Sequence, residues 1–394
     1  MKTREQITDE ILQIKNNHIL LELATSVGKS KFAIEILNNT ANVNKILIVV
    51  PRLVLIDTWK AEFKKWNFEY LLPKVVFSTY VSLDNHIGNW DFVIFDECHH
   101  LSERCIDILK DYKIKRAVLL SATVKFEHKR QLNQLFDDLY CYKVSTRDAI
   151  EGDILPDPNV ILIPLYLDSK LEKEIIIKNP KATGGTITTS YGKRWAYIRN
   201  KSNKIIIYCT EEQRNADYES MIDWYKKKYM STRNEIIKGK WLHLAKERLD
   251  WLSSLKNNYL KQLLEKLKDE RVLTFCNNIE QTEILGKYCI NSKNADSADN
   301  LRLFNEGKIN HITSCNMLNE GVNLVDCRVG IYGNLNSSEI LIAQRLGRLL
   351  RHKNPVIIIP YYKNTREEEL VANMIENYNR DLIKQCKEIK DIKI

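Results

Sequence analysis

Residues 23–30, Leu-Ala-Thr-Ser-Val-Gly-Lys-Ser, have the composition and spacing of a turn that binds phosphate groups. They follow a short apolar run and precede a helical pattern, so N–H groups of the turn and of the helix N-terminus would face a bound anion. Lys29 adds a mobile positive charge, and the Ser30 hydroxyl can ligate Mg²⁺. Leu23 stands where the usual pattern has its first glycine. We expect phosphate and metal contacts from Thr25, Ser26, Val27, Gly28, Lys29 and Ser30.

Two adjacent carboxylates at the end of a second apolar run, Phe92–Phe95, could complete this chemistry. We expect Asp96 to hold the Mg²⁺ through water, and Glu97 to orient and deprotonate an attacking water molecule. A pair of acids at an ordinary strand end is the alternative, but the phosphate-binding turn upstream favours the catalytic interpretation. Together the two segments predict hydrolysis of a nucleoside triphosphate.

Residues 344–351, Gln-Arg-Leu-Gly-Arg-Leu-Leu-Arg, place several cations on a predicted helix far along the chain. A guanidinium group is permanently charged and can bind two phosphate oxygens at once. Such a helix could instead be a basic stripe on the surface. Residues 121–123 (Ser-Ala-Thr) and 319–323 (Asn-Glu-Gly-Val-Asn) lie between the paired carboxylates and this helix in the sequence.

These five stretches, in this order, resemble the motifs of a superfamily 2 helicase of the DExH type. The phosphate-binding turn is similar to that of phage recombination and branch-migration DNA helicases. The resemblance implies ATP as the nucleotide, with the arginines acting as fingers on its γ-phosphate. It also implies coupling of the nucleotide site to a nucleic-acid site. Asn323 stands where aspartate is usual, which weakens any hydrogen-bonding role assigned to its side chain.

The resemblance assigns a role to each matching position. Adenine recognition falls to Gln6, ribose and cleft contacts to Glu320, Gly321 and Asn323, coupling to His99, Ser121, Ala122 and Thr123, and γ-phosphate contacts to Gln344, Arg348 and Arg351.

Two alternating patterns of strands and helices would position these residues. Continuous apolar strands indicate parallel sheets covered on both faces, as in doubly wound α/β domains. In the first pattern the expected strands are Ile19–Leu23, Lys45–Val50, Val75–Ser78, Phe92–Phe95 and Ala117–Leu120. In the second they are Val272–Cys276, His311–Ser314, Val329–Tyr332 and Val356–Pro360, with helices at Ile279–Ile290, Glu339–Leu350 and about Arg366 to Lys390.

With the resemblance, this pattern predicts an α/β fold of two RecA-like doubly wound parallel-sheet domains. The first covers residues 1–165 and carries the phosphate-binding turn. A basic, mainly helical insertion covers residues 166–266, with helical spacing from about Glu211. The second RecA-like domain covers residues 267–394, with the arginine fingers and a C-terminal helix.

The middle segment accounts for the whole net charge of the chain, which is +9. Between residues 168 and 266 there are 21 Lys and Arg against 12 Asp and Glu. This surplus suggests a polyanionic partner, although a merely solvated helical region is the alternative. Lys193, Arg194 and Trp195 interleave cations with an aromatic ring, as a surface that stacks on single strands would. We expect Trp224, Trp241 and Trp251 to be core residues, and Lys226–Lys228 to be a solvated face.

Further nucleic-acid contacts should come from loops that follow the carboxyl ends of the strands. Hydroxyls and backbone amides there can bind phosphates without reading sequence. Thr79 and Ser314 are the best single candidates, although either hydroxyl could equally cap its own loop. The full set is Pro51, Arg52, Thr79, Tyr80, Asn277, Thr313 and Ser314.

Composition indicates the cellular compartment in which the protein would act. No apolar run is long enough to cross a membrane, and the charged N-terminus does not resemble a signal peptide. We expect a cytoplasmic protein, in the host cytoplasm if a phage encodes it. Nine scattered cysteines suggest reduced thiols, because the spacing of a structural zinc site is absent.

Three functions fit these observations. The first is an ATP-dependent DNA helicase or translocase that moves on or remodels branched or duplex DNA. The second is an RNA-dependent ATPase or RNA helicase. The third is a nucleic-acid annealing or remodelling ATPase without processive unwinding. We expect a monomeric motor that acts on DNA rather than RNA, with replication or recombination proteins as candidate partners.

Overall fold

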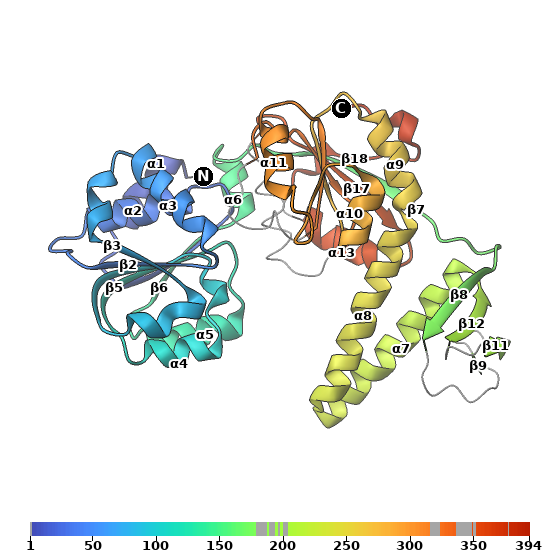
Figure 1. Cartoon of the computed structure of the whole chain (residues 1–394), viewed down its shortest axis with the longest axis horizontal. Coiled ribbons are helices and arrows are strands. Elements are labelled where there is room, and N and C mark those ends of the chain that lie inside the picture. The colour runs from blue at the N-terminus through green and yellow to red at the C-terminus, as the bar shows by residue number, and fades with distance from the viewer. Residues whose placement is uncertain are drawn as a thin grey trace.

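The computed structural model describes residues 2–178, 187–188, 194–195, 198–199, 204–315, 324–335, 349, 352–376 and 378–394. Within these residues the chain forms two α/β domains, each built around a parallel sheet (Figure 1). A mostly helical segment separates the two domains in the sequence. The predicted fold class is therefore confirmed.

The first sheet has six parallel strands in the order β3-β2-β4-β5-β1-β6. Every residue of β2 is buried, as expected for a strand covered on both faces. The five strands expected from apolar runs are present, whereas β6 alternates between exposed and buried residues and has no such run. The bounds are β1 (His18–Leu23), β2 (Ile46–Val50), β3 (Val75–Thr79), β4 (Asn89–Phe95), β5 (Lys113–Ser121) and β6 (Tyr140–Val144).

Helices cover both faces of this sheet, with α1, α2 and α3 on one side and α4 and α5 on the other (Figure 1). The apolar residues on the two faces form separate clusters, and the cluster on the α1–α3 face continues into the second domain. The α-helices are α1 (Arg4–Leu12), α2 (Lys29–Asn38), α3 (Val54–Lys65), α4 (Glu103–Leu109), α5 (Phe126–Leu135) and α6 (Thr146–Glu151), and the short 3-10 helices are η1 (Glu69–Lys74), η2 (Tyr80–His86) and η3 (Cys98–His100).

The second sheet has seven parallel strands in the order β14-β15-β13-β16-β17-β7-β18. Residues 159–165, which we expected to close the first domain, instead form β7 between β17 and β18 of the second sheet. Its Val160 and Ile163 are fully buried in the second domain. The bounds are β7 (Asn159–Leu165), β13 (Val272–Phe275), β14 (Cys289–Ile290), β15 (His311–Ser314), β16 (Val329–Tyr332), β17 (Val356–Tyr362) and β18 (Ile383–Gln385).

Two predicted helices of the second domain are shorter than expected. The helix expected at Ile279–Ile290 ends at Leu285, and its last residues form β14. The C-terminal helix ends at Ile375, and the chain then adds β18 to the sheet edge. The expected helix Glu339–Leu350 lies outside the described residues, apart from Leu349. The helices are α9 (Asn257–Lys266), α10 (Ile279–Leu285), α11 (Ser297–Asn305), α13 (Arg366–Ile375), η5 (Arg380–Leu382) and η6 (Ile389–Asp391).

The middle segment begins with short strands and continues as two long helices. β11, β12 and β8 form an antiparallel sheet, and β10 pairs with β9. The expected helical region does begin at Glu211. The bounds are β8 (Lys173–Lys178), β9 (Ile187–Thr188), β10 (Arg194–Trp195), β11 (Ile198–Arg199), β12 (Lys204–Cys209), α7 (Glu211–Thr232) and α8 (Glu235–Leu255).

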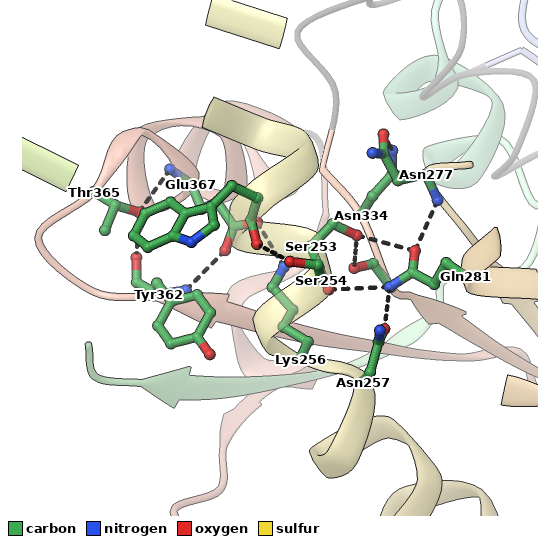
Figure 2. A network of polar contacts seen from close by, with 12 residues as sticks. Ser253, Ser254, Lys256, Asn257, Asn277, Gln281, Asn334, Tyr362, Thr365 and Glu367 are labelled. Carbon is green, nitrogen blue, oxygen red and sulfur yellow. Dashed lines mark hydrogen bonds and ion pairs between the residues drawn. The ribbon is translucent and has the colours of Figure 1, made fainter. Parts of the chain in front are cut away.

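A buried polar network joins the end of α8 to the second domain (Figure 2). Lys256 and Glu367 are both fully buried, and Lys256 Nζ lies 2.6 Å from Glu367 Oε1. Burial lowers the pKa of Lys256, and the ion pair with Glu367 opposes that effect. The Tyr362 N–H donates to Glu367 Oε2, and Ser253 Oγ contacts Gln281 Oε1 at 3.0 Å. These contacts fix the root of α8 against the second sheet.

None of the helices that the structure describes is long and apolar enough to span a membrane. All nine cysteines are free thiols, and seven of them are buried.

Candidate nucleotide and nucleic-acid site

The phosphate-binding turn connects β1 to α2, as the sequence predicts. Gly28 is the N-cap of α2 and has φ +115°, a backbone conformation that strongly favours glycine. No side chain caps this helix end, so its first amides face the position expected for a phosphate. Ser26 also has a positive φ, and the Val27 side chain is fully buried. Val27 can therefore contribute only its backbone to a ligand.

Lys29 and Glu97 form an ion pair beside this turn. Lys29 Nζ lies 2.7 Å from Glu97 Oε1, and the two side chains are 11% and 14% exposed. Burial alone would raise the pKa of Glu97, but Lys29 and His99 outweigh it and lower that pKa to about 2. Glu97 also has φ +48°, a strained conformation for a non-glycine residue and one often found at functional sites. The site therefore holds a charged carboxylate next to the phosphate-binding turn.

Asp96 lies beside this pair and is held by two aromatic residues. Trp59 Nε1 donates to Asp96 Oδ2 at 2.9 Å, and Tyr80 OH donates to the Asp96 carbonyl at 2.6 Å. Burial and the Glu97 carboxylate raise the pKa of Asp96 to about 6. A divalent cation would relieve this crowding of negative charge, and Mg²⁺ prefers hard oxygen ligands such as the Asp96 carboxylate and the Ser30 hydroxyl. The residues present therefore fit a magnesium ion.

A chain of polar contacts leads from the ion pair to residues 121–123. His99 Nδ1 lies 3.4 Å from Glu97 Oε2 and 3.1 Å from Ser121 Oγ. Ser121 Oγ in turn donates to the Thr123 carbonyl at 3.0 Å. The segments around Glu97 and Ser121 come from the ends of neighbouring strands, β4 and β5. The geometry links the two motifs that the resemblance associates with coupling.

A cavity of about 1250 Å³ lies between the two domains beside the phosphate-binding turn. The first domain contributes Arg4 and Ser26 to its lining, and the second contributes His352, Lys353 and Arg380. His352 and Lys353 directly follow the predicted arginine fingers in the chain. The cavity therefore lies between Ser26 of the turn and the residues that follow the predicted fingers, while Lys29, Asp96 and Glu97 are not part of its lining.

The predicted residues 316–323, 344, 348 and 351 lie outside the described part of the chain, and so does Lys193. The backbone of Arg194 and Trp195 forms β10. Leu349, which falls between the two fingers in sequence, is fully buried. A Cβ at Gly330 of β16 would stand 2.0 Å from Leu349 Cδ1. Leu349 therefore packs tightly against β16 of the second sheet.

Gln6 is exposed, and its side chain closes a capping box with Thr3 at the start of α1. Its Oε1 accepts a hydrogen bond from the Thr3 N–H at 2.9 Å. The structure thus gives Gln6 a local structural role, and its contact with adenine stays a prediction.

The expected nucleic-acid contacts divide into accessible and inaccessible side chains. Arg52 is exposed, Pro51 and Thr79 are half-buried, and Thr79 Oγ1 contacts Ser82 Oγ at 3.2 Å. Tyr80 is buried, and its hydroxyl supports Asp96 instead of facing a ligand. The first domain therefore offers Arg52 and Thr79 as its accessible candidates.

The second-domain candidates are largely enclosed. Thr313 and Ser314 are each 2% exposed, and the Thr313 hydroxyl donates to the Thr282 carbonyl. Asn277 Nδ2 donates to Asp250 Oδ1 at 2.6 Å, so its side chain anchors α8. Any contact of these residues with nucleic acid would have to use the backbone or follow a rearrangement.

Comparison with known proteins gives matches to both domains. A family model described as the res subunit of type III restriction enzymes matches residues 2–126, and the helicase conserved C-terminal domain matches residues 255–353. The DNA 3'-5' translocase XPB2 of Sulfurisphaera tokodaii is 21% identical over 372 residues, which cover 86% of this chain and 76% of that protein.

Solved structures share the fold at low sequence identity. The Pyrococcus furiosus Hef helicase domain matches with a TM-score of 0.51 at 13% identity. The aligned region covers 94% of this chain and 97% of the Hef chain. S. cerevisiae Dbp5 bound to RNA and ADP BeF3 matches with a TM-score of 0.57 at 9% identity. The aligned region covers 98% of this chain and 89% of the Dbp5 chain. These similarities support the assignment of two RecA-like domains.

Proposed function

We propose that this chain, a nucleic-acid-dependent ATPase of superfamily 2, uses ATP hydrolysis to translocate on DNA and to remodel duplex or branched DNA. The observation that carries the proposal is the buried Lys29–Glu97 pair, which lies beside Asp96 and contacts His99 on the path to Ser121. This arrangement supports hydrolysis at Lys29 and Glu97, with His99 and Ser121 close enough to respond to it.

Each residue of the proposed site has a separate role in hydrolysis. The amides around Gly28 and the Lys29 ammonium hold the β- and γ-phosphates, so Lys29 exchanges Glu97 for phosphate as a partner. Glu97 then orients the attacking water and accepts its proton. Asp96 and Ser30 would hold a Mg²⁺ ion, which would neutralise phosphate charge when bound. Arg348 and Arg351 stabilise the γ-phosphate from the second domain, and Gln344 approaches it.

Closure of the two domains connects hydrolysis to movement. The cavity beside Ser26 is lined by residues of both domains, so a nucleotide that extends from the phosphate-binding turn toward it would contact both domains and draw them together. Release of phosphate would weaken those contacts and let the domains separate. A strand held across both domains would then advance.

Two similarities favour DNA over RNA. The relative from Sulfurisphaera tokodaii is named as a DNA translocase, and the phosphate-binding turn resembles that of phage DNA helicases. A DNA site lacks the partners for a 2′-hydroxyl that an RNA site must supply.

The proposal is tested by ATPase measurements with matched single-stranded, forked and four-way DNA and with RNA of the same sequence. We expect DNA to stimulate turnover more than RNA, and stimulation to fall as salt is added. Equal or greater stimulation by RNA would contradict the DNA assignment. Turnover that no nucleic acid stimulates would contradict the motor as a whole.

A further inference from the structure

α7 and α8 form a two-helix arm that extends away from the second sheet (Figure 1). The helices have 22 and 21 residues, which corresponds to roughly 30 Å each at 1.5 Å per residue. Arg233, in a left-handed conformation, and the N-cap residue Asn234 make the turn between them. We call residues 224–242, on either side of this turn, the arm tip.

Charge is distributed unevenly along the arm. The arm tip holds six Lys and Arg against one Glu, whereas residues 211–223 at the start of α7 hold five Asp and Glu against one Arg. Lys226, Lys227 and Lys228 are all exposed. Like charges close together on a helix repel one another, and binding of an anionic partner would relieve that repulsion.

Aromatic side chains accompany these cations. Trp224 is 54% exposed, which corrects our expectation of a core residue, and Lys228 Nζ lies 4.5 Å from the centre of its ring. Tyr229 packs against Trp241 with ring centroids 6.0 Å apart, and Arg233 and Lys238 lie near the Tyr229 ring. Trp241 and Trp251 are half-buried, so Trp224 alone of these three presents a large ring surface to solvent.

We propose that the arm tip is a second nucleic-acid-binding site, separate from the ATP-dependent contacts of the two domains, and that its ligand is a single strand. Its cations bind the phosphodiester backbone, and the Trp224 ring stacks on an unpaired base. The inference rests on the proposed function only in taking nucleic acid as the substrate. Exposed aromatics beside cations fit a single strand better than a duplex, because bases in a duplex are already stacked on each other.

The test measures binding of a labelled single-stranded oligonucleotide by fluorescence anisotropy without ATP, using the full chain. A Lys226→Gln, Lys227→Gln, Lys228→Gln variant should bind roughly tenfold more weakly. Its plot of log affinity against log salt should be shallower by about 2, because up to three phosphate contacts are lost. The matched control is Lys384→Gln, Lys387→Gln, Lys393→Gln, which removes the same charge from exposed positions of the second domain.

Stacking is tested at Trp224. Trp224→Ala should weaken single-strand binding about fivefold or more, and Trp224→Phe should restore much of it, since one stacked base contributes about 1–3 kcal/mol. A duplex of the same length should bind equally well to the wild type and to Trp224→Ala. Loss of duplex binding to the same degree would overturn the single-strand assignment.

Two results would overturn the inference altogether. One is unchanged binding by the triple lysine variant, and the other is an equal loss in the control. ATPase activity without nucleic acid should be the same in all these variants. The anisotropy measurement needs no hydrolysis, so the two proposals fail in different ways. ATP turnover that nucleic acid does not stimulate would contradict the motor, whereas unchanged single-strand binding by the triple lysine variant would contradict the arm-tip site.

Discussion

At the scale of single residues, the side chains proposed to carry out hydrolysis contact one another directly. Lys29 is paired with Glu97, and Glu97 contacts His99, so each charged group has an opposite or polar partner. The sequence predicts Lys29, Asp96 and Glu97 because they lie in short motifs with fixed spacing. It does not predict Trp59, which holds Asp96, because a tryptophan on an ordinary helix has no distinguishing pattern around it.

Glu97→Gln tests the assigned base directly. The amide keeps the shape of the side chain but cannot accept the proton, so DNA-stimulated hydrolysis should fall by roughly 10²–10⁴-fold. Binding of a fluorescent ATP analogue and the circular dichroism spectrum should remain close to those of the wild type. The control Glu103→Gln, at an exposed position on α4, should hydrolyse ATP normally. Near-normal turnover in Glu97→Gln would rule out Glu97 as the base.

At the scale of elements, apolar runs predict the central strands well because buried parallel strands are apolar along their whole length. They fail for β6 and β18, which lie at sheet edges and do not need such runs. β7 is apolar, but the sequence does not show that it crosses to the other sheet, because pairing partners far apart in the chain leave no local pattern. The sequence predicts a longer C-terminal helix because charged and apolar residues continue past Ile375. In the structure α13 ends at Ile375, and β18 begins at Ile383.

Gly330→Ala should disturb the packing of Leu349 against β16. The added Cβ would stand 2.0 Å from Leu349 Cδ1, so Leu349 or β16 must move, at about 1–3 kcal/mol of unfolding free energy. Urea denaturation measures this loss. Gly239→Ala on α8 is the matched control, because nothing lies within 4 Å of that site and alanine favours helices. An equally stable Gly330→Ala protein would refute the tight packing.

The Lys256–Glu367 pair should anchor the arm. Lys256→Met alone leaves the Glu367 carboxylate buried without a cation, which should cost about 3–5 kcal/mol of unfolding free energy. The double variant Lys256→Met, Glu367→Gln should recover at least half of that loss, because the amide oxygen still accepts the Tyr362 N–H. Thermal denaturation of the three proteins gives the comparison. Equal losses in the single and double variants would show that the buried charge is not the cause.

At the scale of the whole molecule, we propose that the two domains contribute complementary parts of one site. In this proposal the first domain supplies Lys29, Asp96 and Glu97, and the second supplies the arginines that precede His352 and Lys353, which line a cavity beside Ser26. The order of motifs in the sequence predicts that the fingers and the phosphate-binding turn cooperate. It does not predict that β7, which follows the first domain in the sequence, pairs with β17 and so belongs to the second sheet.

The most direct measurement of this shared site is single-turnover ATP hydrolysis by Arg348→Ala in the presence of DNA, with ATP affinity measured in parallel. Since an arginine finger contributes charge stabilisation in the transition state, hydrolysis should slow roughly a thousandfold while ATP still binds. Arg302→Ala, at an exposed position of the same domain, should hydrolyse ATP at the wild-type rate. An Arg348→Ala protein that hydrolyses ATP as fast as the wild type would contradict a site completed by the second domain.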